Sequence, residues 1–178
     1  IEMSTMEINL VVRGETIAFQ MTYDPGFWSD IGMREYLLRN NLCEPETVHV
    51  LHKVLRPGDT VIDGGANVGF FSVIMSKLVG PQGKVIAFEP GINNHQKFAD
   101  NMALNGVQNV ELIKKPLWSE KTTLDFYLQH DSGLNSLADH PDALCKVPLE
   151  TAVLSNYPWP KLIKLDIEGA EQHALSAL

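Results

Sequence analysis

Residues 63–69 read DGGANVG and follow a short apolar run, Thr60 to Ile62. A second strand-like run, Lys84 to Phe88, is followed directly by Glu89. Glycine lets the chain turn sharply and lets a ligand approach the backbone, and a carboxylate offers two oxygens to the paired hydroxyls of a ribose. Together they predict a site for a nucleoside-containing cofactor, although an empty tight turn or a solvated strand-end acid would explain either feature alone.

The run Lys161 to Asp166 (KLIKLD) ends in a further acid. Asp166 is our candidate for orienting or deprotonating an acceptor hydroxyl. Glu168 and Glu171 have a simpler explanation, because acids in the first turn of a helix stabilise its positive end. Three carboxylates could also hold Mg²⁺ or Ca²⁺, but no companion ligand is evident and we expect no metal. His173 is an alternative base.

The charge at the head of the glycine loop bears on which cofactor it would hold. The loop lacks the G-x-G-x-x-G pattern of dinucleotide-binding folds and begins with Asp63. A carboxylate beside the ligand would repel a pyrophosphate but would suit a cationic group. S-adenosylmethionine carries a sulfonium, an ammonium and a ribose but no phosphate, so the pattern favours it over NAD.

The elements that would carry these residues alternate along the second part of the chain. A helix is expected from Glu44-Pro45-Glu46 to Pro57, followed by strands at 60–63, 84–88, 110–114 and 161–166 and helices at 69–79, 91–105 and from 168 onward. Short apolar strands between helices are typical of a parallel sheet that is buried on both faces. The prediction is a doubly wound, mostly parallel α/β fold, which holds ligands at the carboxyl ends of its strands.

Two regions depart from this alternation. Residues 6–21 alternate apolar and polar side chains around Arg13-Gly14, which predicts a β-hairpin. Residues 122–128 and 145–150 read as strands without an intervening helix, which predicts a β-rich insertion beside the sheet. We therefore divide the chain into an N-terminal hairpin and cap, 1–43, and a Rossmann-like domain, 44–178.

Composition narrows the classes of partner. The formal net charge is -8 and no basic stripe is present, so we expect no nucleic acid partner. No apolar run reaches the length of about 18 residues that a membrane helix needs. Cys43 and Cys145 are the only cysteines and lie far apart, which favours a reducing, cytoplasmic compartment. A homo-oligomer is possible.

Three ordered motifs resemble the FkbM family of S-adenosylmethionine-dependent methyltransferases, a branch of the class I Rossmann-like fold. They are VIDGGANVGFFS (61–72), VIAFEP (85–90) and LIKLDIEGAE (162–171), and the upstream segment LCEPETVHVLHKVLRPGD (42–59) is also similar. The resemblance implies one cofactor site formed by the following residues. The methionine portion would lie at Asp63, Gly65, Asn67 and Gly69, the ribose at Glu89, the adenine beside Trp118, and the transferred methyl near Asp166, with Glu44 as a further contact.

The resemblance implies O-methylation of a hydroxyl group on a sugar, a polyketide or a related small metabolite. The aromatic-rich segment with Tyr23, Phe27, Trp28, Arg34 and Tyr36 could line the acceptor entrance, or pack as a cap. The family's sheet continues with three strands after the DIEGAE segment, so we expect this chain to be incomplete or completed by a partner. Two alternatives are an NAD-dependent oxidoreductase and a non-catalytic cofactor-binding or assembly module.

Overall fold

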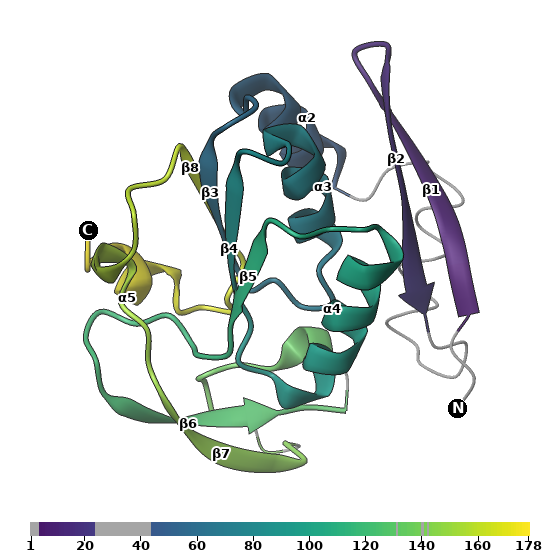
Figure 1. The fold of residues 1–178 in the computed structure, drawn as a ribbon. Coiled ribbons are helices and arrows are strands. Elements are labelled where there is room, and N and C mark those ends of the chain that lie inside the picture. Colours follow the sequence, from purple (N-terminus) through teal and green to yellow (C-terminus); the bar gives the residue numbers. More distant parts are fainter. Residues whose placement is uncertain (1–3, 24–43, 131, 140, 142) are drawn as a thin grey trace.

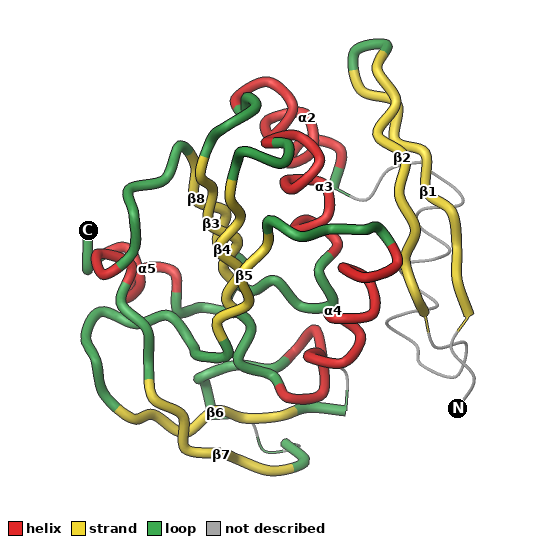
Figure 2. Tube along the Cα trace, in the orientation of Figure 1, coloured by secondary structure: helices red, strands yellow, loops and turns green. Residues whose placement is uncertain are grey.

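A four-stranded parallel sheet lies at the centre of the computed structural model, which describes residues 4–23, 44–130, 132–139, 141 and 143–178 (Figures 1 and 2). The strands follow the spatial order β5-β4-β3-β8. Their bounds are Thr60–Gly64 for β3, Lys84–Phe88 for β4, Val110–Ile113 for β5 and Leu162–Leu165 for β8. The chain therefore runs to one side of β3 and later returns to its other side, so the strand order reverses between β3 and β8. Open α/β sheets hold their ligands outside the carboxyl ends of the strands at such a point.

Both faces of this sheet are buried, as the short apolar strands predict. Val61 and Val85 point into one core cluster, while Ile62 and Ile86 point into a second cluster on the opposite face. Figure 1 shows helices α2 (Pro45–Val54), α3 (Phe70–Val79) and α4 (Ile92–Leu104) on the first face and the short helix α5 (Glu171–Leu175) on the second. The α/β fold with a parallel sheet and helices on both faces is confirmed.

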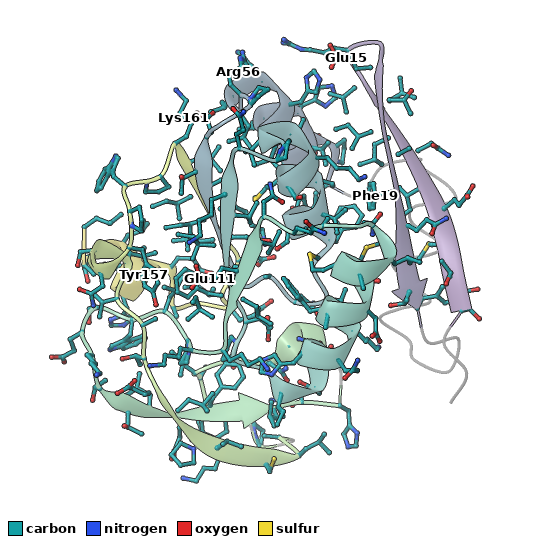
Figure 3. All side chains as sticks on the ribbon, in the orientation of Figure 1. Glu15, Phe19, Arg56, Glu111, Tyr157 and Lys161 are labelled. Atoms are coloured by element: carbon teal, nitrogen blue, oxygen red, sulfur yellow. The ribbon has the colours of Figure 1, made fainter. Side chains whose placement is uncertain are left out.

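The predicted N-terminal hairpin is present and shares the first core. Strands β1 (Ser4–Val12) and β2 (Glu15–Tyr23) pair antiparallel across Arg13 and Gly14. Both turn residues have positive φ angles, 53° and 84°, as two-residue hairpin turns of this hand require. Phe19 points from β2 toward the helices (Figure 3) and meets Phe70 edge to face, with ring centroids 5.5 Å apart. The hairpin is thus packed against the helical layer.

The predicted β-rich insertion forms a separate antiparallel ribbon. Strands β6 (Thr123–Leu128) and β7 (Cys145–Glu150) pair only with each other among the named strands. Two short 3₁₀ helices flank β7, at Ser132–Leu134 and Leu154–Asn156. A single parallel bridge between Leu117 and Ala152 joins the segment after β5 to the segment after β7. The ribbon therefore lies beside the carboxyl ends of the parallel strands without extending their sheet (Figure 1).

One predicted boundary is wrong. The last helix begins at Glu171, and Glu168 lies outside it, in a turn with a φ angle of 52° followed by Gly169 at 94°. Left-handed residues cannot continue a right-handed helix, so Glu168 does not stabilise a helix terminus. Glu171 does lie in the first turn, and its carboxylate accepts a hydrogen bond from the backbone N–H of Ile167 at 2.8 Å.

Among the described residues, no helix combines the length and the apolar character that crossing a membrane requires. Strand β8 pairs with β3 on one side, and no described strand pairs with its other side.

The packing of the hairpin predicts a large effect of truncating Phe19. We expect Phe19→Ala to lower the free energy of unfolding by about 3–5 kcal/mol, because the ring is buried against Phe70. The matched control is Val11→Ala on β1, whose side chain is exposed, and which should cost less than about 1 kcal/mol. Urea denaturation of both variants measures the difference. Equal losses would show that the hairpin does not pack as described.

Candidate functional site

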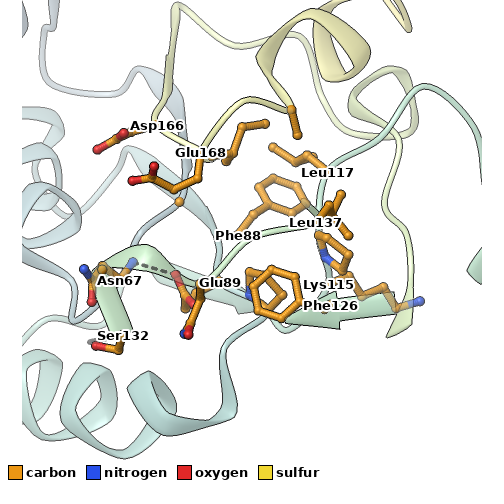
Figure 4. Close-up of a pocket in the computed structure, with 17 residues that line it drawn as sticks. Asn67, Phe88, Glu89, Lys115, Leu117, Phe126, Ser132, Leu137, Asp166 and Glu168 are labelled. Carbon is orange, nitrogen blue, oxygen red and sulfur yellow. Dashed lines mark hydrogen bonds between the residues drawn. The ribbon is translucent and has the colours of Figure 1, made fainter. Parts of the chain in front are cut away.

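A cavity opens at the carboxyl ends of the parallel strands (Figure 4). The empty space inside it is about 600 Å³ when the open mouth is included. The segments that follow β3, β4, β5 and β8 line it, and the β6–β7 ribbon with its 3₁₀ turn closes the remaining side. Four residues predicted from the sequence lie on its wall: Gly65, Asn67, Glu89 and Asp166.

Glu89 is the buried carboxylate of this cavity, at 5% exposure. Its Oε2 accepts a hydrogen bond from the backbone N–H of Asn67 at 2.8 Å, and Figure 4 shows this bond. Its Oε1 accepts from the backbone N–H of Gly91 at 2.8 Å and from Nδ2 of Asn94 at 3.2 Å. Burial raises the pKa of Glu89 above its ordinary value, the three hydrogen bonds act in the opposite direction, and nearby Asp63 raises the pKa further.

These contacts leave Glu89 with limited capacity for a ligand. A carboxylate has about four lone-pair sites, and protein donors fill three of them. Glu89 can therefore accept one further strong hydrogen bond, and not a separate bond from each of two hydroxyls unless a protein donor is displaced. A second acceptor is close by, because Oδ1 of Asn67 is buried without a hydrogen-bond partner. This end of the cavity thus suits a ligand that presents O–H or N–H donors.

The opposite end of the cavity is apolar. Figure 4 shows Phe88, Leu117, Phe126 and Leu137 gathered on the side away from Asn67 and Asp166. Phe126 and Leu137 come from the β6–β7 ribbon and the loop within it. The sequence analysis missed both, because the stretch TTLDFYL predicts a strand but carries no motif that aims one of its side chains at a ligand. Apolar walls of this kind suit a flat, weakly polar ring.

Gly65 is required by the approach of two loops. Its φ angle is 75°, and a Cβ atom built on it would overlap the backbone carbonyl of Asp166. The loop after β3 and the loop after β8 therefore meet backbone to backbone at this glycine. This contact helps to bring Asn67 and Asp166 to the same cavity.

Asp63 does not line the cavity, which corrects the charge argument drawn from the sequence. Its carboxylate is fully buried, accepts a hydrogen bond from Oγ of Ser72 at 2.6 Å, and lies 3.6 Å from Nζ of Lys164. Lys164 also lies 3.5 Å from Oδ2 of Asp166. The charge of Asp63 is thus balanced inside the protein and does not face a ligand.

Lys164 is a residue that the sequence analysis missed. Its Nζ contacts the carboxylates of Asp63 and Asp166, lies 3.4 Å from the carbonyl oxygen of Gly65, and sits 5.0 Å from the ring centroid of Phe71. A lysine in the middle of the apolar strand KLIKLD is the one signal that could have revealed it, since a buried ammonium group needs anionic partners. It joins the acids at the ends of β3 and β8.

Asp166 and Glu168 form the acidic rim of the cavity (Figure 4). The side chain of Asp166 is 58% exposed, so a ligand can reach it. Burial raises the pKa of Glu168, and the neighbouring charges of Asp166 and Glu171 raise it further. Within the described residues, no group of three or more His, Cys, Asp or Glu side chains is arranged to hold a metal ion.

Three further residues predicted for the site do not line the cavity. Gly69 caps α3, and a Cβ atom there would meet Met102 and Phe98 of α4, so this glycine serves helix packing. Trp118 stacks on His173 of α5, with ring centroids 3.8 Å apart. This contact leaves His173 packed against an indole ring. Glu44 precedes α2, where its carboxylate accepts a hydrogen bond from Thr47.

The proposed acceptor entrance cannot be compared with the structure at most of its residues. Phe27, Trp28, Arg34 and Tyr36 lie outside the described residues.

Comparisons with known proteins bear on the family and the fold. Residues 63–177 match the family model described as the methyltransferase FkbM domain. A protein named Methyltransferase 1 from Beauveria bassiana (strain ARSEF 2860) is 29% identical, with 68% of this chain and 59% of the relative covered. Methyltransferase sdnD from Sordaria araneosa is 37% identical, with 66% and 60% covered. The chain thus spans about 60% of the length of these curated relatives.

A solved structure is also similar. The crystal structure of a methyltransferase FkbM from Methylobacillus flagellatus KT matches with a TM-score of 0.47 and 18% identity, covering 87% of this chain and 41% of that chain.

The backbone contact at Gly65 predicts a specific cost of adding a methyl group there. We expect Gly65→Ala to lower the free energy of unfolding by about 1–3 kcal/mol more than Gly58→Ala does. Both glycines have positive φ angles, 75° and 92°, but a Cβ atom on Gly58 would meet nothing, so the control carries the backbone strain without the overlap. Denaturant unfolding measures both. Equal losses would mean that the two loops do not touch at Gly65.

Proposed function

The chain belongs to the FkbM methyltransferase family, and from that premise we propose that it transfers a methyl group from S-adenosylmethionine to a hydroxyl group of a sugar, a polyketide or a related small metabolite. The observation that carries the proposal is the division of one cavity into two ends. Unfilled acceptors on Glu89 and Asn67 lie at one end, and the apolar side chains of Phe126 and Leu137 lie at the other. A nucleoside presents hydroxyl donors and a flat ring in this way.

The residues present fit S-adenosylmethionine. Glu89 would accept one ribose hydroxyl through its remaining lone-pair site, and Oδ1 of Asn67 would accept a second hydroxyl or an ammonium N–H. Phe126 and Leu137 would flank the adenine in place of Trp118, which the structure places against His173. When bound, the cofactor supplies a methyl group on a positively charged sulfur.

Asp166 is the candidate for handling the acceptor. Methyl transfer from sulfur is an in-line displacement in which the position of the acceptor oxygen behind the methyl group decides the rate. Asp166 lies on the cavity wall and is exposed, so its carboxylate can accept the hydrogen bond of an acceptor hydroxyl and take its proton. Nζ of Lys164, on strand β8, lies 3.5 Å from Oδ2 of this carboxylate and helps to fix its position.

Of the alternatives, NAD-dependent oxidation is less well supported. Three carboxylates line the cavity, those of Glu89, Asp166 and Glu168, and the lining ammonium group of Lys115 is paired with Glu150. Such a wall disfavours a pyrophosphate. A non-catalytic module would share the cavity, so only an activity measurement separates it from an enzyme.

The proposal is tested by calorimetry with S-adenosylhomocysteine and with NAD, followed by methyl transfer to a panel of hydroxylated acceptors. We expect binding of the first ligand alone and transfer to at least one acceptor. Binding of NAD in preference would overturn the assignment of the cofactor. Binding of S-adenosylhomocysteine without transfer to any acceptor, in the chain and in a version extended by the region that its relatives possess, would favour a non-catalytic module.

Two isosteric substitutions should separate cofactor binding from transfer. Glu89→Gln replaces a charged acceptor, so we expect the affinity for S-adenosylhomocysteine to fall by about 10–100-fold. Asp166→Asn should leave that affinity within about twofold, because the carboxylate acts on the acceptor, but should lower kcat by about 100-fold or more. Calorimetry and a methyl-transfer assay measure the two effects. A loss of affinity in Asp166→Asn equal to that in Glu89→Gln would contradict the division of roles.

The raised pKa of Glu89 predicts opposite pH dependences for binding and for stability. Hydroxyl donors favour the ionised carboxylate, so affinity should fall by about tenfold per pH unit as the pH drops below this pKa. Without ligand, the folded protein binds the Glu89 proton more tightly than the unfolded chain does. This group's contribution to stability is therefore present at low pH and is lost as the pH rises from the ordinary glutamate pKa through the raised one. Glu89→Gln should flatten both profiles, measured by calorimetry and by denaturation.

A further inference from the structure

Asn101 connects the N-terminal hairpin to the glycine loop. It lies on α4 and is fully buried. Its Oδ1 accepts hydrogen bonds from the backbone N–H of Thr22 at 2.7 Å and from Oγ1 of the same residue at 2.9 Å, while its Nδ2 donates to the carbonyl oxygen of Val68 at 2.8 Å. One amide group therefore bonds β2 on one side and the loop at 65–69 on the other.

A second asparagine one turn later on α4 provides the comparison. Oδ1 of Asn105 accepts from the backbone N–H of Gln20 at 2.8 Å, and its Nδ2 donates to the carbonyl oxygen of Gln20 at 2.7 Å. Four residues of helix rise by about 6 Å, and two residues of strand by about 6.6 Å. The spacing of the two amides on α4 is thus close to the spacing of Gln20 and Thr22 on β2. Their hydrogen bonds fix the position of the helix along the hairpin.

The two asparagines differ in what they contact on the far side. Nδ2 of Asn105 also donates to the carbonyl oxygen of Asn101 in its own helix, whereas Nδ2 of Asn101 reaches the glycine loop. The residue next to Val68 in that loop is Asn67, which lines the cavity, whose N–H bonds Glu89 and whose Oδ1 is buried without a hydrogen-bond partner. One hydrogen-bonded path from the hairpin to the site therefore runs through Asn101.

We propose that Asn101 is a positioning residue that transmits the packing of the β1–β2 hairpin to the loop at 65–69, and so holds Asn67 toward Glu89 and toward the ligand. The effect on cofactor binding rests on the proposed function, whereas the effect on the loop does not. Neither Asn101 nor Thr22 lines the cavity, so any effect of changing them on ligand affinity is indirect, and amide exchange in the loop at 65–69 shows whether it passes through that loop.

The primary test compares Asn101→Asp with Asn105→Asp. Each carboxylate keeps an acceptor for the hairpin and removes the Nδ2 donor. Asn101 is fully buried and Asn105 only partly buried, so the unfolding free energy of each variant is measured alongside. We expect Asn101→Asp to raise the hydrogen-exchange rate of the loop amides of Asn67 and Gly69 by about tenfold, as the loss of one hydrogen bond implies, and to weaken S-adenosylhomocysteine binding by a similar factor. Asn105→Asp should leave both within about twofold.

A milder pair keeps the test decisive if a buried acid prevents folding. Thr22→Val removes the hydroxyl that bonds Asn101, at a site with no bond to the loop, and Thr5→Val changes the residue opposite it on β1. We expect the loop amides to exchange faster in Thr22→Val. In Thr5→Val their exchange rates should be unchanged. The proposal fails if Thr22→Val leaves loop exchange unchanged, or if Asn101→Asp and Asn105→Asp shift it equally. If loop exchange responds as expected but the unchanged protein does not bind S-adenosylhomocysteine, Asn101 keeps its role and the proposed cofactor falls.

Discussion

The site depends on the hydrogen bonds that stabilise the buried carboxylate of Glu89. A buried carboxylate needs hydrogen-bond donors, and Glu89 obtains them from Asn67, Gly91 and Asn94. These donors belong to the loop after β3 and to the start of α4, so one side chain at the end of β4 ties both segments together. Burial raises its pKa and the hydrogen bonds lower it, so each further donor to the carboxylate would lower the pKa again. Much of the cavity is arranged around this requirement.

The order of strands and helices in the parallel sheet could be predicted from the sequence because each element carries its own local signal. The strand at Lys84–Phe88 was placed with its observed bounds, since an apolar run between Gly83 and Pro90 leaves little choice. The helix expected from Glu168 failed because Glu168 and Gly169 adopt left-handed angles, and no local pattern requires a glutamate to do so. The bounds of an element were thus predictable where the local amino-acid composition determines them. They were not predictable where they depend on the backbone angle of a single residue.

The site was predictable to the extent that motifs lie at strand ends. Gly65, Asn67, Glu89 and Asp166 meet at the cavity because parallel strands end at the same edge. Lys164, Phe126 and Asn101 were not foreseen, because their roles depend on partners far away in the chain, such as Asp63 for Lys164 and Thr22 for Asn101. The same distance explains the error over Asp63, whose neutralising lysine follows it by about a hundred positions. A charge in a motif cannot be assigned to a ligand until its internal partners are known.

The β6–β7 ribbon has a consequence for how the cavity can change over evolutionary time. It supplies Phe126 to the apolar wall. Its described strands do not pair with the parallel sheet, and it is joined to the segment after β5 by the bridge between Leu117 and Ala152 and by the ion pair between Lys115 and Glu150. Substitutions in the ribbon can therefore reshape the cavity without disturbing the pairing of β3, β4, β5 and β8. Glu89 and Gly65 at the strand ends have no such freedom, because they also fix the backbone. Glu89 bonds the N–H of Asn67, and Gly65 lets the loops after β3 and β8 meet. Divergence of ligand preference is expected to accumulate on the ribbon while the opposite wall stays fixed.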